Sequence, residues 1–136
     1  MLEKPLLNMY IGREREKDKI TMTLKLFLAC ILILCGHIVA WYATYSQFIW
    51  TWCRDNIVLI PLLFAVPTSY LFIFGMKFAV EEMGDAWGPR LLGFGLSYLV
   101  FPFLTYWYFG ESVLEPKTLV CVLLSFVIIA IQVFWK

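Results

Sequence analysis

Charge is scarce in this sequence. Asp, Glu, Lys and Arg make up 15% of its 136 residues, whereas hydrophobic residues make up 62%. A soluble domain normally carries about 25% charged residues. This scarcity excludes an ordinary soluble domain and predicts an integral membrane protein. The net charge is only +1 and no basic stripe is present, so we expect no nucleic-acid partner.

Sequence motifs that carry chemistry are missing as well. The chain has four cysteines, but no CxxC pair and no Cys/His cluster. We therefore expect neither a metal site nor a cofactor, and interpret the thiols as small apolar side chains. No Gly-x-Ser-x-Gly, Walker-type or zincin motif occurs. These absences predict a protein that is not an enzyme.

Four long runs have no charged residue at all. They are Leu26–Cys53, Asn56–Met76, Leu91–Gly110 and Thr118–Trp135. A helix needs roughly 20 apolar residues to cross the hydrocarbon layer, and none of the runs alternates as a membrane β-strand does. We predict an all-α, multi-pass membrane protein, with four transmembrane helices in one compact bundle, residues 1–136. The expected spans are 24–45, 56–78, 89–110 and 117–135, after an N-terminal segment, 1–23.

The distribution of positive charge predicts the orientation of these spans. Of the 11 Lys and Arg residues, only Arg54 and Lys117 lie in the loops directly after the first and the third spans. Lys and Arg favour the cytoplasmic side, so both termini and the middle loop are predicted to be cytoplasmic. The first 25 residues lack the pattern of a signal peptide. We expect a short helix or a disordered tail there, whose apolar side suits a membrane surface or a partner.

Polar and aromatic residues within the spans are the candidates for a binding site. His37 lies mid-span, where a histidine is costly unless paired. It is either a substrate or proton site, or a neutral side chain bonded to a neighbouring helix. The aromatic clusters at the outer ends are either interface anchors or pocket walls. The candidate lining residues are His37, Tyr42, Tyr70, Tyr98, Tyr106 and Trp107.

Two other features of the spans and loops have alternative interpretations. Pro67 and Pro102 predict helix kinks, either as packing features or as flexing points of a transporter. The middle loop holds Glu81, Glu82 and Asp85. We interpret these carboxylates as helix-capping charges in a solvated turn rather than as acid/base or metal-binding groups.

The C-terminal stretch "FGESVLEPKTLVCVLLSFVIIAIQVFWK" resembles the final hairpin of the drug/metabolite transporter superfamily. In that superfamily a penultimate helix ends in Gly-Glu and a last helix closes the chain; Gly110 and Glu111 match here. Small four-helix relatives also resemble "VAWYATYS" in the first span. The small multidrug resistance proteins carry a glutamate midway along their first helix, where His37 is the nearest polar residue here.

Helix termination is an alternative explanation of the Gly110-Glu111 pair. Gly110 would end the helix in a left-handed conformation, and Glu111 would be solvated or paired with Lys117 or Arg54.

The resemblance implies a transporter-like protein that moves a small or amphipathic solute by alternating access as a homodimer. The alternative is a non-catalytic structural or accessory subunit of a larger membrane assembly. The lack of a mid-membrane carboxylate and the charged N-terminal segment favour this alternative. A lipid-binding or flippase role is a third possibility. In each case the lipid bilayer is a partner.

Overall fold

The structure, a computed structural model, describes residues 4–135, without the side chains at positions 7 and 22. In this range every regular element is a helix, as predicted. Four helices are long and apolar enough to cross a membrane: α1 (Lys4–Ile49), α3 (Leu59–Met83), α4 (Trp87–Phe109) and α5 (Pro116–Phe134). A fifth, short helix that was not predicted, α2 (Thr51–Asp55), joins α1 to α3.

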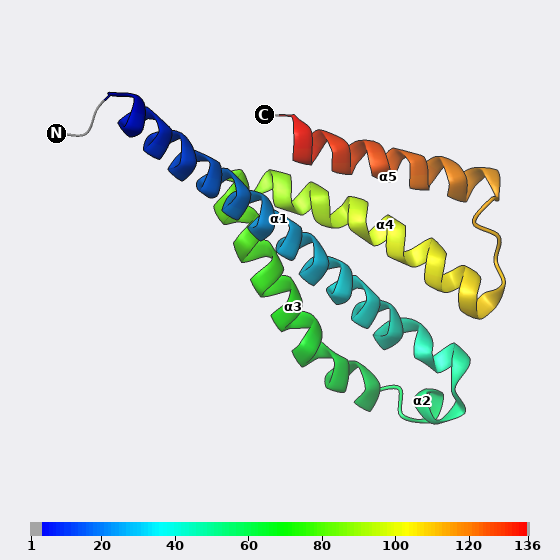
Figure 1. Cartoon of the computed structure of the whole chain (residues 1–136). Coiled ribbons are helices and arrows are strands. Elements are labelled where there is room, and N and C mark those ends of the chain that lie inside the picture. The colour runs from blue at the N-terminus through cyan, green and yellow to red at the C-terminus, as the bar shows by residue number, and fades with distance from the viewer. Residues whose placement is uncertain (1–3, 136) are drawn as a thin grey trace.

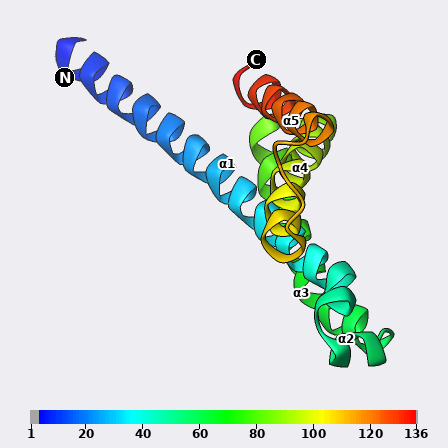
Figure 2. The same cartoon turned by 90° about the vertical axis from the view of Figure 1, so that its right-hand side faces the viewer.

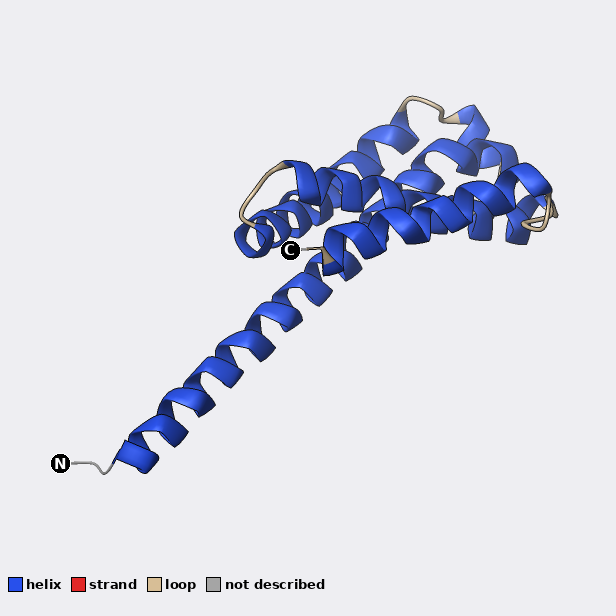
Figure 3. Ribbon diagram, turned by 90° about the horizontal axis from the view of Figure 1, so that it is seen from above, coloured by secondary structure: helices blue, strands red, loops and turns tan. Residues whose placement is uncertain are grey.

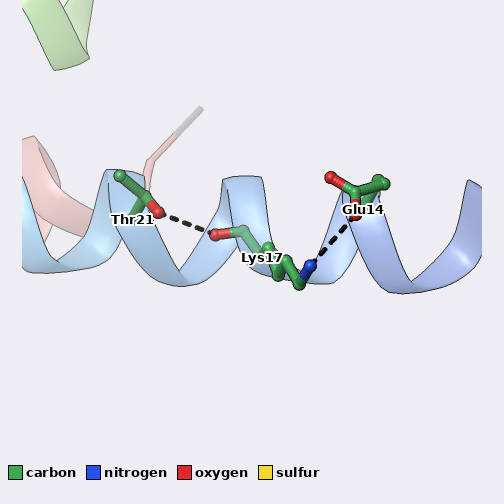
Figure 4. Close-up of polar contacts among 3 residues, drawn as sticks. All are labelled: Glu14, Lys17 and Thr21. Carbon is green, nitrogen blue, oxygen red and sulfur yellow. Dashed lines mark hydrogen bonds and ion pairs between the residues drawn. The ribbon is translucent and has the colours of Figure 1, made fainter.

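The first helix is longer than predicted. We expected a separate segment over residues 1–23, but α1 runs without a break from Lys4 to Ile49. Its charged stretch is made of good helix formers. There Lys17 Nζ lies 3.0 Å from Glu14 Oε1, and Thr21 Oγ1 donates to the Lys17 carbonyl at 3.0 Å (Figure 4). Nothing in this stretch breaks the helix, so the charged residues and the first apolar run form one continuous helix. Its N-terminal part extends away from the other helices (Figure 3).

The four long helices lie side by side in an open arrangement. Helix α1 packs between α3 and α4, and α5 packs on the other side of α4 (Figure 1). Consecutive long helices are antiparallel, so α2 and the α4–α5 loop lie at one end of the molecule (Figures 1 and 2). The compact bundle that we predicted is therefore only partly formed. Helix α5 packs mainly on α4, and Ser125 is its one buried residue.

Glycines allow the closest contacts between these helices. A Cβ atom added at Gly75 of α3 would lie 2.8 Å from Ile33 Cγ1 of α1. One added at Gly95 of α4 would lie 2.9 Å from Ile129 Cγ1 of α5. Small residues let apolar helices approach closely. The buried core consists of Ile33, Leu92 and Leu96, where α1 and α4 meet.

Both candidate kink prolines lie inside helices that continue past them. Pro67 is within α3 and Pro102 is within α4. Proline has no backbone N–H, so the carbonyl group of Tyr98, four residues before Pro102, lacks its usual helical donor. Flexing of α3 and α4 at these residues stays a prediction.

Candidate functional site

A cleft with a volume of about 510 Å³ lies between α1 and α4 and contains His37. From α1 it is lined by His37, Ala40, Trp41, Thr44 and Tyr45. From α4 it is lined by Phe94, Ser97, Tyr98, Val100 and Phe101. Residues three and four apart share one face of a helix. The cleft is therefore formed by one stripe of polar and aromatic side chains on each helix.

His37 joins the two helices that form the cleft. Its Nε2 atom lies 2.9 Å from the carbonyl oxygen of Gly93. A carbonyl oxygen only accepts, so Nε2 carries the proton and donates. In the neutral imidazole, Nδ1 then carries the lone pair. The ring of Phe72 on α3 packs edge-on against the imidazole at 4.9 Å between centroids. His37 is thus both bonded to a neighbouring helix and part of the cleft wall.

An aromatic cluster closes the end of the cleft nearest α2. Trp41 is only 4% exposed and stacks on Tyr45 and Tyr108, with centroid distances of 5.1 and 5.5 Å. The Tyr42 hydroxyl lies 2.9 Å from the Tyr108 hydroxyl. These contacts connect the C-terminal parts of α1 and α4. Trp41 is therefore a buried wall of the cleft rather than an exposed interface anchor.

The structure brings together only part of the predicted lining. His37 and Tyr98 line the cleft, and Tyr42 lies next to it in the aromatic cluster. Tyr70, Tyr106 and Trp107 are 60%, 54% and 78% exposed and lie outside it. Tyr106 and Trp107 are off the stripe of α4 that faces α1. Tyr70 is on α3, which contacts a different side of α1.

Several lining residues were missed from the sequence. Trp41, Thr44, Ser97 and Phe101 belong to the same stripes as His37 and Tyr98. The helical spacing of 37, 41 and 44, and of 94, 97, 98 and 101, was visible in the sequence. This spacing did not identify the lining residues, because aromatic residues also occur on the other sides of both helices.

A second recess, of about 610 Å³, lies where α3 ends and α4 begins, and the C-terminal end of α5 borders it. Two carboxylates line it, but both have partners. Glu82 lies 3.7 Å from Lys25 Nζ of α1, and Asp85 Oδ1 accepts from the Gly88 N–H at 2.6 Å. Asp85 therefore caps α4, as predicted. The expectation of a solvated Glu82 was wrong: its side chain is 9% exposed, because it packs against α1.

Gly110 ends α4 in the predicted left-handed conformation. Its φ angle is +69°, and its N–H donates to the Tyr106 carbonyl at 3.0 Å. Glu111 is exposed. Within residues 4–135 the ion pairs are Lys17–Glu14 and Lys25–Glu82, so Glu111 pairs with neither Arg54 nor Lys117 there. The Gly-Glu pair thus has a structural role that depends on its glycine.

Gly110→Ala is expected to lower the free energy of unfolding by about 1 kcal/mol, because a left-handed conformation is strained for any residue with a Cβ atom. Glu111→Ala should leave it unchanged. Thermal unfolding of both variants in detergent would measure the difference. An equal loss in Glu111→Ala would show that the carboxylate also makes a stabilising contact.

Comparison with known proteins finds no matching protein-family model, no matching curated protein and no matching solved structure. The resemblance of the C-terminal hairpin to the drug/metabolite transporter superfamily therefore stays a prediction.

Proposed function

We propose that this chain is a transporter-like membrane protein that holds a small or amphipathic solute in the α1–α4 cleft. The observation that supports it most is the composition of this cleft. It places the single histidine of the chain among aromatic side chains from two helices. Small-molecule sites are typically concave, mostly apolar, 300–1,000 Å³ in volume and lined by a few placed polar groups, as this cleft is.

The proposed setting is a lipid bilayer crossed four times, with both ends of the chain cytoplasmic. Lys25, Glu82 and Arg90 lie at the end of the helices where α3 joins α4, and the Lys25–Glu82 pair joins α1 to α3 there. His37 lies in the uncharged part of α1, between Lys25 and Arg54. This arrangement supports a cleft within the apolar layer, with charges at the two boundaries of that layer.

The proposed working unit is a homodimer. A single chain forms an open layer in which α5 has one buried residue and many large apolar side chains are exposed. One layer does not enclose a path across a bilayer. Two copies facing each other would enclose one, and flexing at Pro67 and Pro102 would open it to either side in turn.

Uptake into liposomes tests this proposal. Purified protein is reconstituted in phosphatidylcholine vesicles, and uptake of ethidium and of 4-methylumbelliferyl glucoside is compared with that of empty vesicles. We expect uptake of at least one probe, reduced about tenfold in His37→Ala by the loss of a hydrogen-bonding group in an apolar site. Tyr70→Ala, on the exposed side of α3, is the control and should keep full uptake. Uptake equal to that of empty vesicles, or unchanged in His37→Ala, would contradict the proposal.

One observation favours the alternative, an accessory subunit of a larger assembly. The N-terminal part of α1 extends away from the other helices and exposes Leu6, Met9, Tyr10 and Ile11 (Figure 3). Such an apolar helix side is suited to docking on another protein. The native mass after gentle extraction separates the two functions. A homodimer alone supports the transporter, and stoichiometric recovery in a larger complex supports the subunit.

A further inference from the structure

We infer that the α1–α4 cleft selects neutral aromatic solutes that carry an O–H or N–H donor, and that it discriminates against cations. This inference rests on the proposed function in one respect, namely that the cleft is the solute site. It is based on the lack of Asp, Glu, Lys and Arg in the lining of the cleft, and on the hydrogen-bonding groups and rings found there.

The charge pattern disfavours a cation. None of the described residues that line the cleft is Asp, Glu, Lys or Arg. The Arg90 guanidinium lies 5.1 Å from the ring centroid of Phe94, which lines the cleft. A charge placed in an apolar site without a counter-charge is strongly disfavoured. Arg90 already lies over the Phe94 ring, whose face would otherwise attract a cation, and its charge repels a second one, so a neutral solute is favoured over a cation.

The hydrogen-bonding groups of the cleft are left as acceptors. Ser97 Oγ donates its hydrogen to the Phe94 carbonyl at 2.7 Å, and Thr44 Oγ1 donates to the Ala40 carbonyl at 3.0 Å. His37 Nε2 donates to Gly93. The lone pairs of both hydroxyl oxygens and of His37 Nδ1 remain. At these three atoms a solute must therefore supply the hydrogen.

The other polar groups of the cleft do not reverse this pattern. Trp41 Nε1 is buried without a hydrogen-bond partner, and its accessible surface is too small for a direct contact with a solute. Tyr45 and Tyr98 carry hydroxyl groups that accept as well as donate. The cleft therefore has three groups that can only accept, whereas Tyr45 and Tyr98 can accept or donate, so a solute with a donor can bond to more of the lining than one without.

The shape of the lining favours a flat solute. Tyr45, Phe94, Tyr98 and Phe101 present rings to the cleft, and Trp41 forms its buried end. Aromatic rings gain from offset and edge-on contacts with other rings. The volume of about 510 Å³ suits a molecule of a few fused rings. An acyl chain has no hydrogen-bond donor and would leave the three acceptors unused.

Equilibrium binding to the full chain in phosphatidylcholine nanodiscs tests the inference. The probes are 1-naphthol, 1-methoxynaphthalene, which lacks the donor, and the N-methylquinolinium cation, each corrected for partitioning into empty nanodiscs. We expect 1-naphthol to bind about tenfold more tightly than 1-methoxynaphthalene, the effect of one additional hydrogen bond. The cation should not compete. Because this series needs no substitution, it does not depend on the folding of a variant.

Two substitutions locate the acceptor. His37→Phe keeps a ring against Phe72 but removes Nδ1 together with the Nε2 bond to Gly93, and Ser97→Ala removes one hydroxyl oxygen. The preference for 1-naphthol should disappear in at least one of them and persist in Tyr70→Ala. Equal binding of the two neutral probes, tighter binding of the cation, or no binding above empty nanodiscs would overturn the inference. The last result would indicate a cleft filled by lipid or by a second copy.

The two proposals fail in different ways. Selective binding of 1-naphthol without uptake of any probe into vesicles would keep the inference and reject transport. Ethidium uptake that depends on His37, with no preference for 1-naphthol, would keep transport and reject the inference.

Discussion

Gly75→Val is expected to lower the free energy of unfolding by about 3 kcal/mol, the upper part of the range for overpacked interiors. A Cβ atom at this position would lie 2.8 Å from Ile33 Cγ1 and 3.3 Å from the Ile33 backbone nitrogen. Ile33 is fully buried and belongs to the core with Leu92 and Leu96. The neighbouring atoms are backbone or buried side chain, so α1 and α3 must move apart.

This prediction is measured by titrating the folded protein with sodium dodecyl sulphate in mixed micelles, with circular dichroism as the readout. Gly12→Val is the matched control on α1, because a Cβ atom there would meet nothing within 4 Å. Only helix propensity changes at that position, by less than about 1 kcal/mol. An equally small effect at Gly75 would show that the α1–α3 contact contributes little to stability.

Gly95→Val is expected to release α5 from α4, at a cost of about 2 kcal/mol. The added Cβ atom would lie 2.9 Å from Ile129 Cγ1 and 3.3 Å from the Ser125 carbonyl oxygen. Helix α5 packs mainly on α4, so this contact is the main one that holds it in place. Hydrogen exchange in detergent, followed by mass spectrometry, should show faster exchange in residues 116–134 and unchanged exchange in α1 and α3.

Gly93 provides the control two residues away on the same helix. A Cβ atom there would meet Met76 Cε at 3.0 Å, the far end of a flexible side chain that can rotate away. Gly93→Val should therefore cost less than half as much and leave exchange in α5 unchanged. If both variants accelerated exchange in α5 alike, loss of a glycine rather than the α4–α5 contact would be the cause.

The sequence by itself determined the kind of element, the number of long helices and the end of α4. The four runs without charge predicted the four long helices, because a long apolar run satisfies its backbone only as a helix in an apolar setting. Gly110 ends α4 with a φ angle of +69°, as expected. Helix α3 runs past residue 78, the predicted end of its span, to Met83, and Gly84 ends it with a φ angle of +77°. Pro116 begins α5, where its missing N–H costs nothing.

Only the tertiary structure decided which side chains form the cleft. Tyr98 lines it whereas Tyr106 and Trp107 do not, although all three lie in the same apolar helix. A helix that is apolar all round has no polar face to show which side is buried. His37 and its partner Gly93 are 56 positions apart, and only the packing of α1 against α4 brings them together. Hydropathy carries no information about shape, so the order of the helices and the site between them came from packing.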